Sequence, residues 1–110
     1  MDTFYEEDIL GEGFQRTTLS LRDDYEGSVV ATLVRRLSDT GNGRSVLYIH
    51  GFNDYFFQRE MACRLNERSF HFYALDLRKY GRSWLSHQKF NDIRDIRAYF
   101  EEITLALQMI

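Results

Sequence analysis

The chain contains no proline in its 110 residues. An average proline content of about 5% would predict roughly five or six in a chain of this length. Proline fixes φ and often stiffens turns, so the loops of this chain lack that source of rigidity. Chance, lineage bias and a sequence that has been altered or engineered are all compatible with this composition.

Cysteine is also scarce. The single residue, Cys63, excludes an internal disulfide and fits a reducing compartment. The chain begins with an acidic segment, unlike the basic start of a secretory signal peptide. No apolar run approaches the ~20 residues that a membrane-spanning helix requires, so we expect no transmembrane segment. Together these absences predict a cytoplasmic protein.

Two kinds of partner are not expected. The net charge of −3 argues against nucleic acid, because binding a phosphate backbone needs a basic face. The three histidines, His50, His71 and His87, follow no metal-ligand spacing. We therefore expect no bound metal and no other cofactor.

The residues that are present predict one folded domain over 1–110. Apolar residues make up 44% of the chain and aromatic residues 15%, which is enough for a core. The patterns predict a three-layer α/β fold. Its expected parts are a lead-in arm over 1–16 with room for one short helical turn, an antiparallel β-hairpin over 17–36, a parallel strand–helix–strand unit over 45–76, and a helix over 91–110.

The strand–helix–strand unit carries clear local signals. Residues 46–49 are continuously apolar, as in a strand that is covered on both faces. Asn53 or Asp54 is placed to cap a following helix by accepting its free N–H groups. Residues 70–76 are expected to return as a parallel strand through a right-handed crossover.

The last segment has a helical apolar pattern beginning near Asp92. Apolar residues recur at alternating spacings of three and four, and they are Ile93, Ile96, Phe100, Ile103, Leu107 and Ile110. Such spacing places all of them on one side of a helix. We expect this stripe to face the core, or alternatively to face a partner.

Two motifs point to a family. Ile49-His50-Gly51-Phe52 ends the apolar strand, and Asp76-Leu77-Arg78-Lys79-Tyr80-Gly81-Arg82-Ser83 begins 26 positions after His50. At this spacing and in this context, the pair resembles the N-terminal part of α/β-hydrolases of the serine aminopeptidase and monoacylglycerol lipase (lysophospholipase-like) type. The resemblance covers roughly residues 17–110 and implies the corresponding half of an α/β-hydrolase sheet.

The resemblance also implies roles for the residues after the apolar strand. The N–H of Phe52 is expected to be one oxyanion-hole donor, with His50, Gly51 and Asn53 supporting it. Acyl transfer builds negative charge on a carbonyl oxygen, and fixed backbone N–H groups stabilise that charge. A structural motif is expected to brace the loop after strand 70–76, and its members are Asp76, Arg78, Gly81 and Ser83.

A matching nucleophile is missing from the chain. The family's Gly-x-Ser-x-Gly motif does not occur, because Gly43-Arg44-Ser45 and Gly81-Arg82-Ser83 both lack the closing glycine. The triad's acid and histidine are not expected here either, so we predict no catalytic residue. The expected function is an N-terminal fragment of a serine hydrolase of esters or peptides, inactive alone. The alternative is a non-catalytic binding or self-association module.

The implied strand order also predicts an open edge. Strand 46–49 is expected beside strand 70–76, and the family's next neighbour of strand 46–49 would follow Ile110. Unpaired apolar edges favour pairing with another chain. We therefore expect a homo-oligomer formed through strand 46–49 or through helix 92–110.

Overall fold

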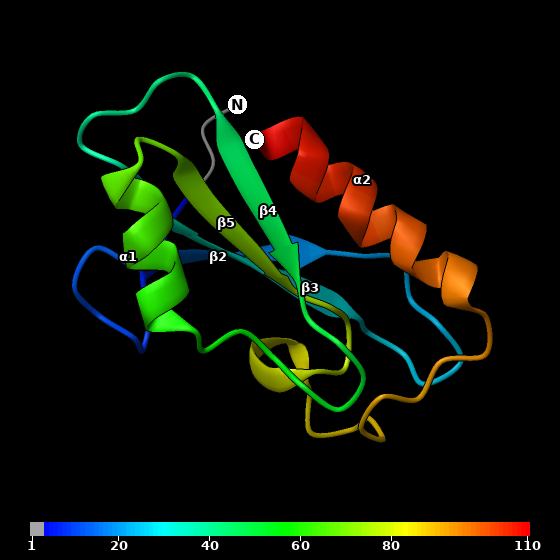
Figure 1. Ribbon diagram of the computed structural model, residues 1–110. Helices are drawn as coiled ribbons and strands as arrows, with labels where there is room; N and C mark the ends of the chain where they lie inside the picture. The colour runs from blue at the N-terminus through cyan, green and yellow to red at the C-terminus, as the bar shows by residue number, and fades with distance from the viewer. Residues whose placement is uncertain (1–3) are drawn as a thin grey trace.

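A computed structural model describes residues 4–110 of the chain. They form an α/β fold with a five-stranded mixed sheet of order β1-β2-β3-β5-β4 (Figure 1). The pair β4–β5 is parallel and the other neighbours are antiparallel. The elements are β1 (Glu6–Glu7), β2 (Gln15–Ser20), β3 (Val30–Arg36), β4 (Ser45–Ile49), α1 (Arg59–Glu67), β5 (His71–Asp76), the 3₁₀ turns η1 (Gly81–Ser83) and η2 (Ile96–Ala98), and α2 (Tyr99–Met109).

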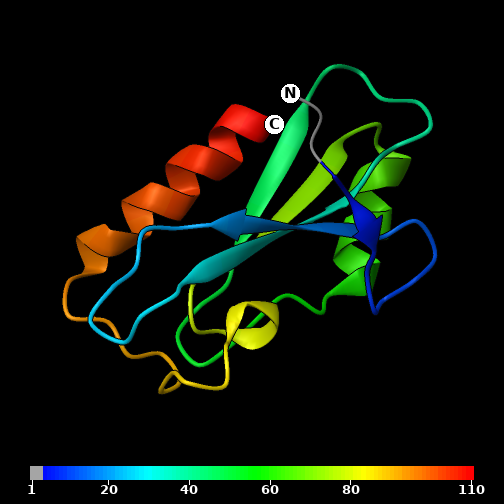
Figure 2. The same ribbon diagram turned by 180° about the vertical axis from the view of Figure 1, so that it is seen from behind.

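The two helices cover opposite faces of the sheet, as both Figure 1 and Figure 2 show. Neighbouring residues of a strand point to opposite faces, so each strand contributes to two clusters. Leu33 and Leu75 pack with Ala106 of α2 on one face. Val34 and Ala74 pack with Ala62 of α1 on the other. The predicted three-layer α/β arrangement is confirmed. No helix among residues 4–110 is both long and apolar enough to cross a bilayer.

The predicted antiparallel hairpin is confirmed as β2 and β3. Their register runs from Gln15↔Arg35 to Ser20↔Val30. Gly27, in the connecting turn, has a φ of 108°, a conformation that favours glycine. The strand begins at Gln15 rather than at Thr17, so the predicted boundary of the lead-in arm is wrong by two residues.

The lead-in arm is part of the sheet. Glu6 pairs with Arg16 and Glu7 with Gln15, which adds the two-residue strand β1 at the outer edge of β2. The Glu6 carboxylate accepts a hydrogen bond of 3.2 Å from Arg16 Nε, so unlike charges support the pairing. The possible helical turn in this arm is replaced by two backbone turns within residues 8–14. Residues 1–3 of the predicted arm lie outside the described residues.

The strand–helix–strand unit is confirmed, but the predicted helix start is wrong. Helix α1 begins at Arg59, and neither Asn53 nor Asp54 caps it. Asn53 has a φ of 57°, which differs from the extended backbone of an N-cap residue. The Phe56 amide donates to the buried Asp76 carboxylate at 2.8 Å. This bond holds the segment before Arg59 in an irregular conformation.

The final helix also begins later than predicted. Helical structure starts with η2 at Ile96, and Asp95 caps it by accepting the Arg97 amide at 2.9 Å. The Asp92 carbonyl instead accepts hydrogen bonds from Lys79 Nζ and the Tyr25 hydroxyl, each at 2.7 Å. These tertiary bonds explain why residues 92–94 stay outside the helix.

The predicted apolar stripe coincides only in part with the core face of this helix, because Ile103 packs against the core whereas other members are exposed. Glu102 and Ala106 are fully buried, whereas Phe100 is 64% exposed and Leu107 is 60% exposed. The cause is Arg78, whose side chain and amide bond to the Glu102 carboxylate at 2.7–3.2 Å. This buried pair rotates α2 so that a glutamate faces the sheet and part of the apolar stripe faces solvent.

We predict that Glu102→Gln lowers the free energy of unfolding by about 2–4 kcal/mol, because it removes the fully buried one of the two carboxylates that neutralise the Arg78 guanidinium. Glu101→Gln is the matched control, since Glu101 also contacts Arg78 but is partly exposed. The control should cost less than about 1 kcal/mol. Urea denaturation followed by circular dichroism measures both, and equal losses would contradict the assignment.

Candidate functional site

The site begins where β4 ends, at the corner formed by residues 50–53. His50 is buried, and its Nε2 accepts the Leu77 amide at 3.0 Å. Its Nδ1 lies 2.8 Å from the Gly51 carbonyl oxygen. Because a carbonyl only accepts, these partners assign the proton to Nδ1. Both ring nitrogens are therefore engaged: Nε2 joins the corner to the loop after β5, and Nδ1 braces the corner itself.

Phe52 presents a free backbone donor at this corner. Its amide has no hydrogen-bond acceptor among residues 4–110, and its side chain is 81% exposed. Phe52 and Asn53 form a turn in which Asn53 has a positive φ. The Asn53 side-chain oxygen accepts a weak bond of 3.3 Å from Asn91, which ties the turn to the loop after β5.

A pocket of about 370 Å³ opens beside this corner. It is bounded on one side by the corner and on the other by the segment leading into α2. Its lining is mainly apolar and consists of His50, Gly51, Phe52, Leu77, Tyr80, Asn91, Ile93, Ile96 and Tyr99. A largely apolar hollow with a few polar groups is the usual form of a small-molecule site.

Two tyrosines form the inner wall of the pocket. The ring of Tyr80 lies 4.6 Å from that of His50, measured between ring centres. Burial raises the pKa of Tyr99 well above its ordinary value, and a hydrogen bond with Tyr80 raises it further. The Tyr99 hydroxyl therefore stays protonated at physiological pH and can donate or accept a hydrogen bond.

Asp76, Gly81 and Ser83 of the predicted loop motif lie close together below the corner. Asp76 is fully buried, and one of its oxygens accepts the Arg82 amide and side chain at 3.1 and 3.0 Å. The Ser83 hydroxyl donates to the Asp76 carbonyl at 2.6 Å. Gly81 has a φ of 44°, and a Cβ there would lie 2.5 Å from the Cβ of Tyr55. Arg78, the fourth member, points instead to α2.

Two cations of this loop were missed as structural residues by sequence reasoning. Arg82 binds both carboxylate oxygens of Asp8 at 2.7 and 2.8 Å, which ties the N-terminal arm to the loop. Lys79 joins the β2–β3 turn to the Asp92 segment in a second network. The available signal was the density of charge itself, because four of residues 76–82 have charged side chains. Their acidic partners are too distant in sequence to be identified from spacing.

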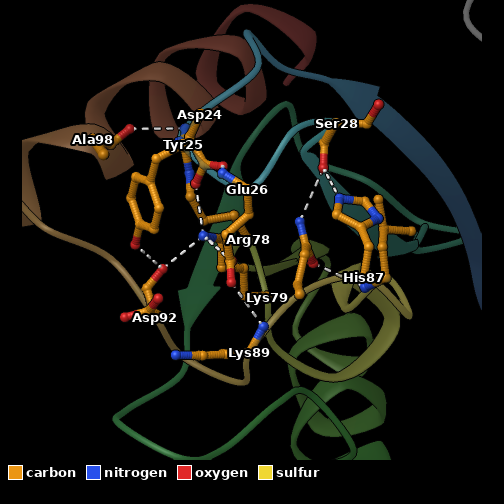
Figure 3. A network of polar contacts seen from close by, with 12 residues as sticks. Asp24, Tyr25, Glu26, Ser28, Arg78, Lys79, His87, Lys89, Asp92 and Ala98 are labelled. Carbon is orange, nitrogen blue, oxygen red and sulfur yellow. Dashed lines mark hydrogen bonds and ion pairs between the residues drawn. The ribbon is translucent and has the colours of Figure 1, made fainter.

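The Lys79 ammonium group is completely buried and is neutralised by the β2–β3 turn (Figure 3). It lies 2.6 Å from carboxylate oxygens of both Asp24 and Glu26. The Tyr25 ring lies 4.5 Å from the same nitrogen. Burial on its own lowers the pKa of Lys79, but the hydrogen bonds to Asp24 and Glu26 outweigh it and raise the pKa. Lys79 therefore remains charged.

The described residues place no activated nucleophile at the corner. Ser83 is fully buried, and its hydroxyl contacts only Thr32 and the Asp76 carbonyl. Ser45 lies at the start of β4, at the opposite end from the corner. Among residues 4–110, no serine or cysteine side chain bonds to a histidine ring. The same residues contain no group of three or more His, Cys, Asp or Glu side chains that could hold a metal ion.

Comparisons with known proteins add no assignment to this geometry. No protein-family model and no curated protein matches the chain.

We predict that Lys79→Met destabilises the fold by about 3–5 kcal/mol, because it leaves two carboxylates without their buried counter-charge. Lys89→Met is the control, since the chain has only these two lysines and Lys89 is exposed. The control should change stability by less than about 0.5 kcal/mol. In native protein, reductive methylation should modify Lys89 and spare Lys79, and modification of both at similar rates would contradict this burial.

We also predict loss of stability in acid. Burial alone raises the pKa of Asp8, but hydrogen bonds from Arg82 and the Leu10 amide outweigh it and hold the pKa below its ordinary value. The pKa values of Asp24 and Glu26 are likewise lowered by bonds to Lys79. These three carboxylates therefore stabilise the fold fully when the pH is above their unfolded-state pKa values, near pH ~4. This stabilisation is lost as the pH falls through their lower folded-state pKa values.

The urea midpoint should accordingly stay level from neutral pH to about pH 5 and fall below about pH 4. Asp8→Asn should lower the midpoint at neutral pH and flatten this acid dependence. Asp39→Asn, in an exposed loop, should leave the curve unchanged. If Asp8→Asn and the unmodified chain lost stability in parallel, the Asp8–Arg82 pair would not be a source of the acid sensitivity.

Proposed function

We propose that this chain is the oxyanion-donating part of a serine hydrolase of esters or peptides, in an α/β-hydrolase sheet. The observation that carries the proposal is the free Phe52 amide at the mouth of a largely apolar pocket. A negatively charged oxygen placed there would accept this N–H while an acyl chain filled the hollow. Fixed backbone donors of this kind stabilise the developing oxyanion of acyl transfer.

The remaining corner residues support the donor rather than take part in proton transfer. Both nitrogens of His50 are engaged with backbone groups, so the ring has no free nitrogen to serve as a general base. Gly51 has no atoms within 4 Å of the position a Cβ would occupy, which leaves the approach to the pocket open. The chain therefore binds and polarises an acyl group but does not cleave it alone. Its free thiol, Cys63, fits the cytoplasm as the compartment.

A second candidate is a non-catalytic module that binds apolar molecules in the same pocket. The observation favouring it is the predominance of apolar side chains in the lining. The two functions differ in what they demand of the ligand. An oxyanion corner prefers a carboxylate to a neutral molecule of similar length, whereas a purely apolar pocket does not.

We predict that hexanoate shifts the Phe52 amide resonance in a two-dimensional ¹H–¹⁵N spectrum and that hexan-1-ol binds more weakly. Phe52→Pro removes the N–H and should weaken hexanoate binding by about tenfold, the value of one hydrogen bond to a charged group. Proline suits this position because it precedes a turn residue of positive φ. Phe52→Ala is the control, because it removes the exposed ring and keeps the donor.

Equal weakening in Phe52→Pro and Phe52→Ala would contradict the oxyanion corner. Equal binding of hexanoate and hexan-1-ol would favour the apolar module. The chain alone should not hydrolyse p-nitrophenyl esters. Robust turnover that is blocked by a serine-directed phosphonate would overturn the proposed lack of a nucleophile.

A further inference from the structure

A second, smaller hollow adjoins the apolar pocket at the corner. It has a volume of about 260 Å³ and lies between the segment after β4 and the loops after β5. We call it the side pocket, and its lining residues are Asn53, Asp54, Tyr55, Tyr80, Gly81, Phe90 and Asn91. Complete small-molecule sites usually measure about 300–1,000 Å³, so the side pocket suits one chemical group of a larger ligand.

The walls of the side pocket are fixed to each other within the described chain. Gly81 packs so closely on Tyr55 that a Cβ on the glycine would lie 2.5 Å from the tyrosine Cβ. Asn91 donates the bond of 3.3 Å to the Asn53 side chain. The side pocket is therefore shaped by contacts among residues 4–110. Tyr80 and Asn91 line both hollows, so one ligand can occupy the two together.

Asp54 gives the side pocket a negative charge. It is the one residue of this lining with a formal charge at neutral pH. Asp54 is partly buried, yet it forms no ion pair within residues 4–110. The nearby carboxylates of Asp8 and Asp76, in contrast, both bind Arg82. A partly desolvated carboxylate without a counter-charge favours a cationic ligand.

Aromatic rings supply much of the remaining lining. Phe90 is 66% exposed and stacks on Trp84, with 4.6 Å between the ring centres and 16° between the ring planes. This stacking occupies one face of the Phe90 ring and leaves the other face for a ligand. Tyr55 is also exposed, whereas Tyr80 is buried. The faces of aromatic rings carry negative charge density and attract cations, and quaternary ammonium groups are bound in this way.

We propose that the side pocket binds an organic cation, an ammonium group attached to carbon. The Asp54 carboxylate neutralises the charge, and the rings of Tyr55 and Phe90 contact the carbon atoms around it. A hard metal cation suits the side pocket less, because such ions take several oxygen ligands and the lining has a single carboxylate. A neutral or anionic group would leave that carboxylate without a counter-charge.

The wall shared with the apolar pocket gives the cation a place in a substrate. An acyl chain in the apolar pocket, with its carbonyl oxygen at the Phe52 amide, leaves the alcohol or amine portion to pass Tyr80 into the side pocket. The substrate class is then an ester or amide whose alcohol or amine portion carries an ammonium group. This role rests on the proposed function, whereas binding of the cation does not.

Titration with choline chloride, followed in a two-dimensional ¹H–¹⁵N spectrum, tests the site. We expect saturable shifts of the amides of residues 53–55 and 90–91 in the millimolar range. Sodium chloride at equal ionic strength should not produce them. The neutral analogue 3,3-dimethylbutan-1-ol, in which carbon replaces the charged nitrogen, should bind ~fivefold or more weakly. Ethanolamine, a primary ammonium, is compared with choline, and the tighter of the two identifies the class of ammonium group.

Two substitutions, each with a matched control, assign the binding to the side pocket. Asp54→Asn should weaken choline binding by ~fivefold or more, whereas Asp39→Asn removes the same charge from an exposed loop and should have no effect. Phe90→Leu should weaken binding by ~threefold, and Phe100→Leu, which alters an exposed phenylalanine of α2, should not. Circular dichroism checks that each variant folds, and Asp54→Asn breaks no ion pair.

The proposal would be overturned if neither cation bound, if sodium chloride or the neutral alcohol gave the same shifts, or if Asp54→Asn bound choline as tightly as the unmodified chain. Its failure is distinct from failure of the oxyanion corner. Hexanoate binding at the Phe52 amide without choline binding would overturn the cation site alone. Choline binding without hexanoate binding would support the cation site and contradict its role in an acyl substrate.

Discussion

The buried carboxylate of Asp76 is the interaction on which the loops of this protein depend. It ends strand β5, and its two oxygens hold the Phe56 amide before α1 and the Arg82 side chain within η1. Arg82 in turn binds Asp8, which ties the N-terminal arm to the same point. A carboxylate without these donors would carry a large desolvation cost, so the loops and the charge stabilise each other.

Buried charge also determines how the remaining segments lie on the sheet. Arg78 orients α2 through Glu102, and Lys79 fastens the β2–β3 turn and the Asp92 segment. Every buried side-chain nitrogen and oxygen among the described residues has a hydrogen-bond partner. This complete hydrogen bonding matters because a buried charge that lacked part of its partners would favour other arrangements of the chain. The same loop also holds the corner at His50, because its Leu77 amide donates to the His50 ring.

Much of the fold could be predicted from local pattern. The β2–β3 hairpin, the parallel β4–β5 pair and the presence of two helices follow from turn residues and apolar periodicity. The end of β4 at His50-Gly51 could be located as well, because an apolar strand leading into this dipeptide is a local feature. The starts of α1 and α2 could not, since Asp76 and Lys79 hold those segments through bonds between residues distant in sequence.

The sequence by itself determined the alternation of strands and helices, because side-chain direction repeats every two residues in a strand and every 3.6 in a helix. It also determined that the chain contains no Gly-x-Ser-x-Gly motif. Only the tertiary structure decided which face of α2 is buried. Periodicity assigns the core to Phe100 and Leu107, whereas pairing with Arg78 turns Glu102 inward. The free energy of neutralising a buried guanidinium depends on its partner in space, and that partner cannot be identified from local spacing.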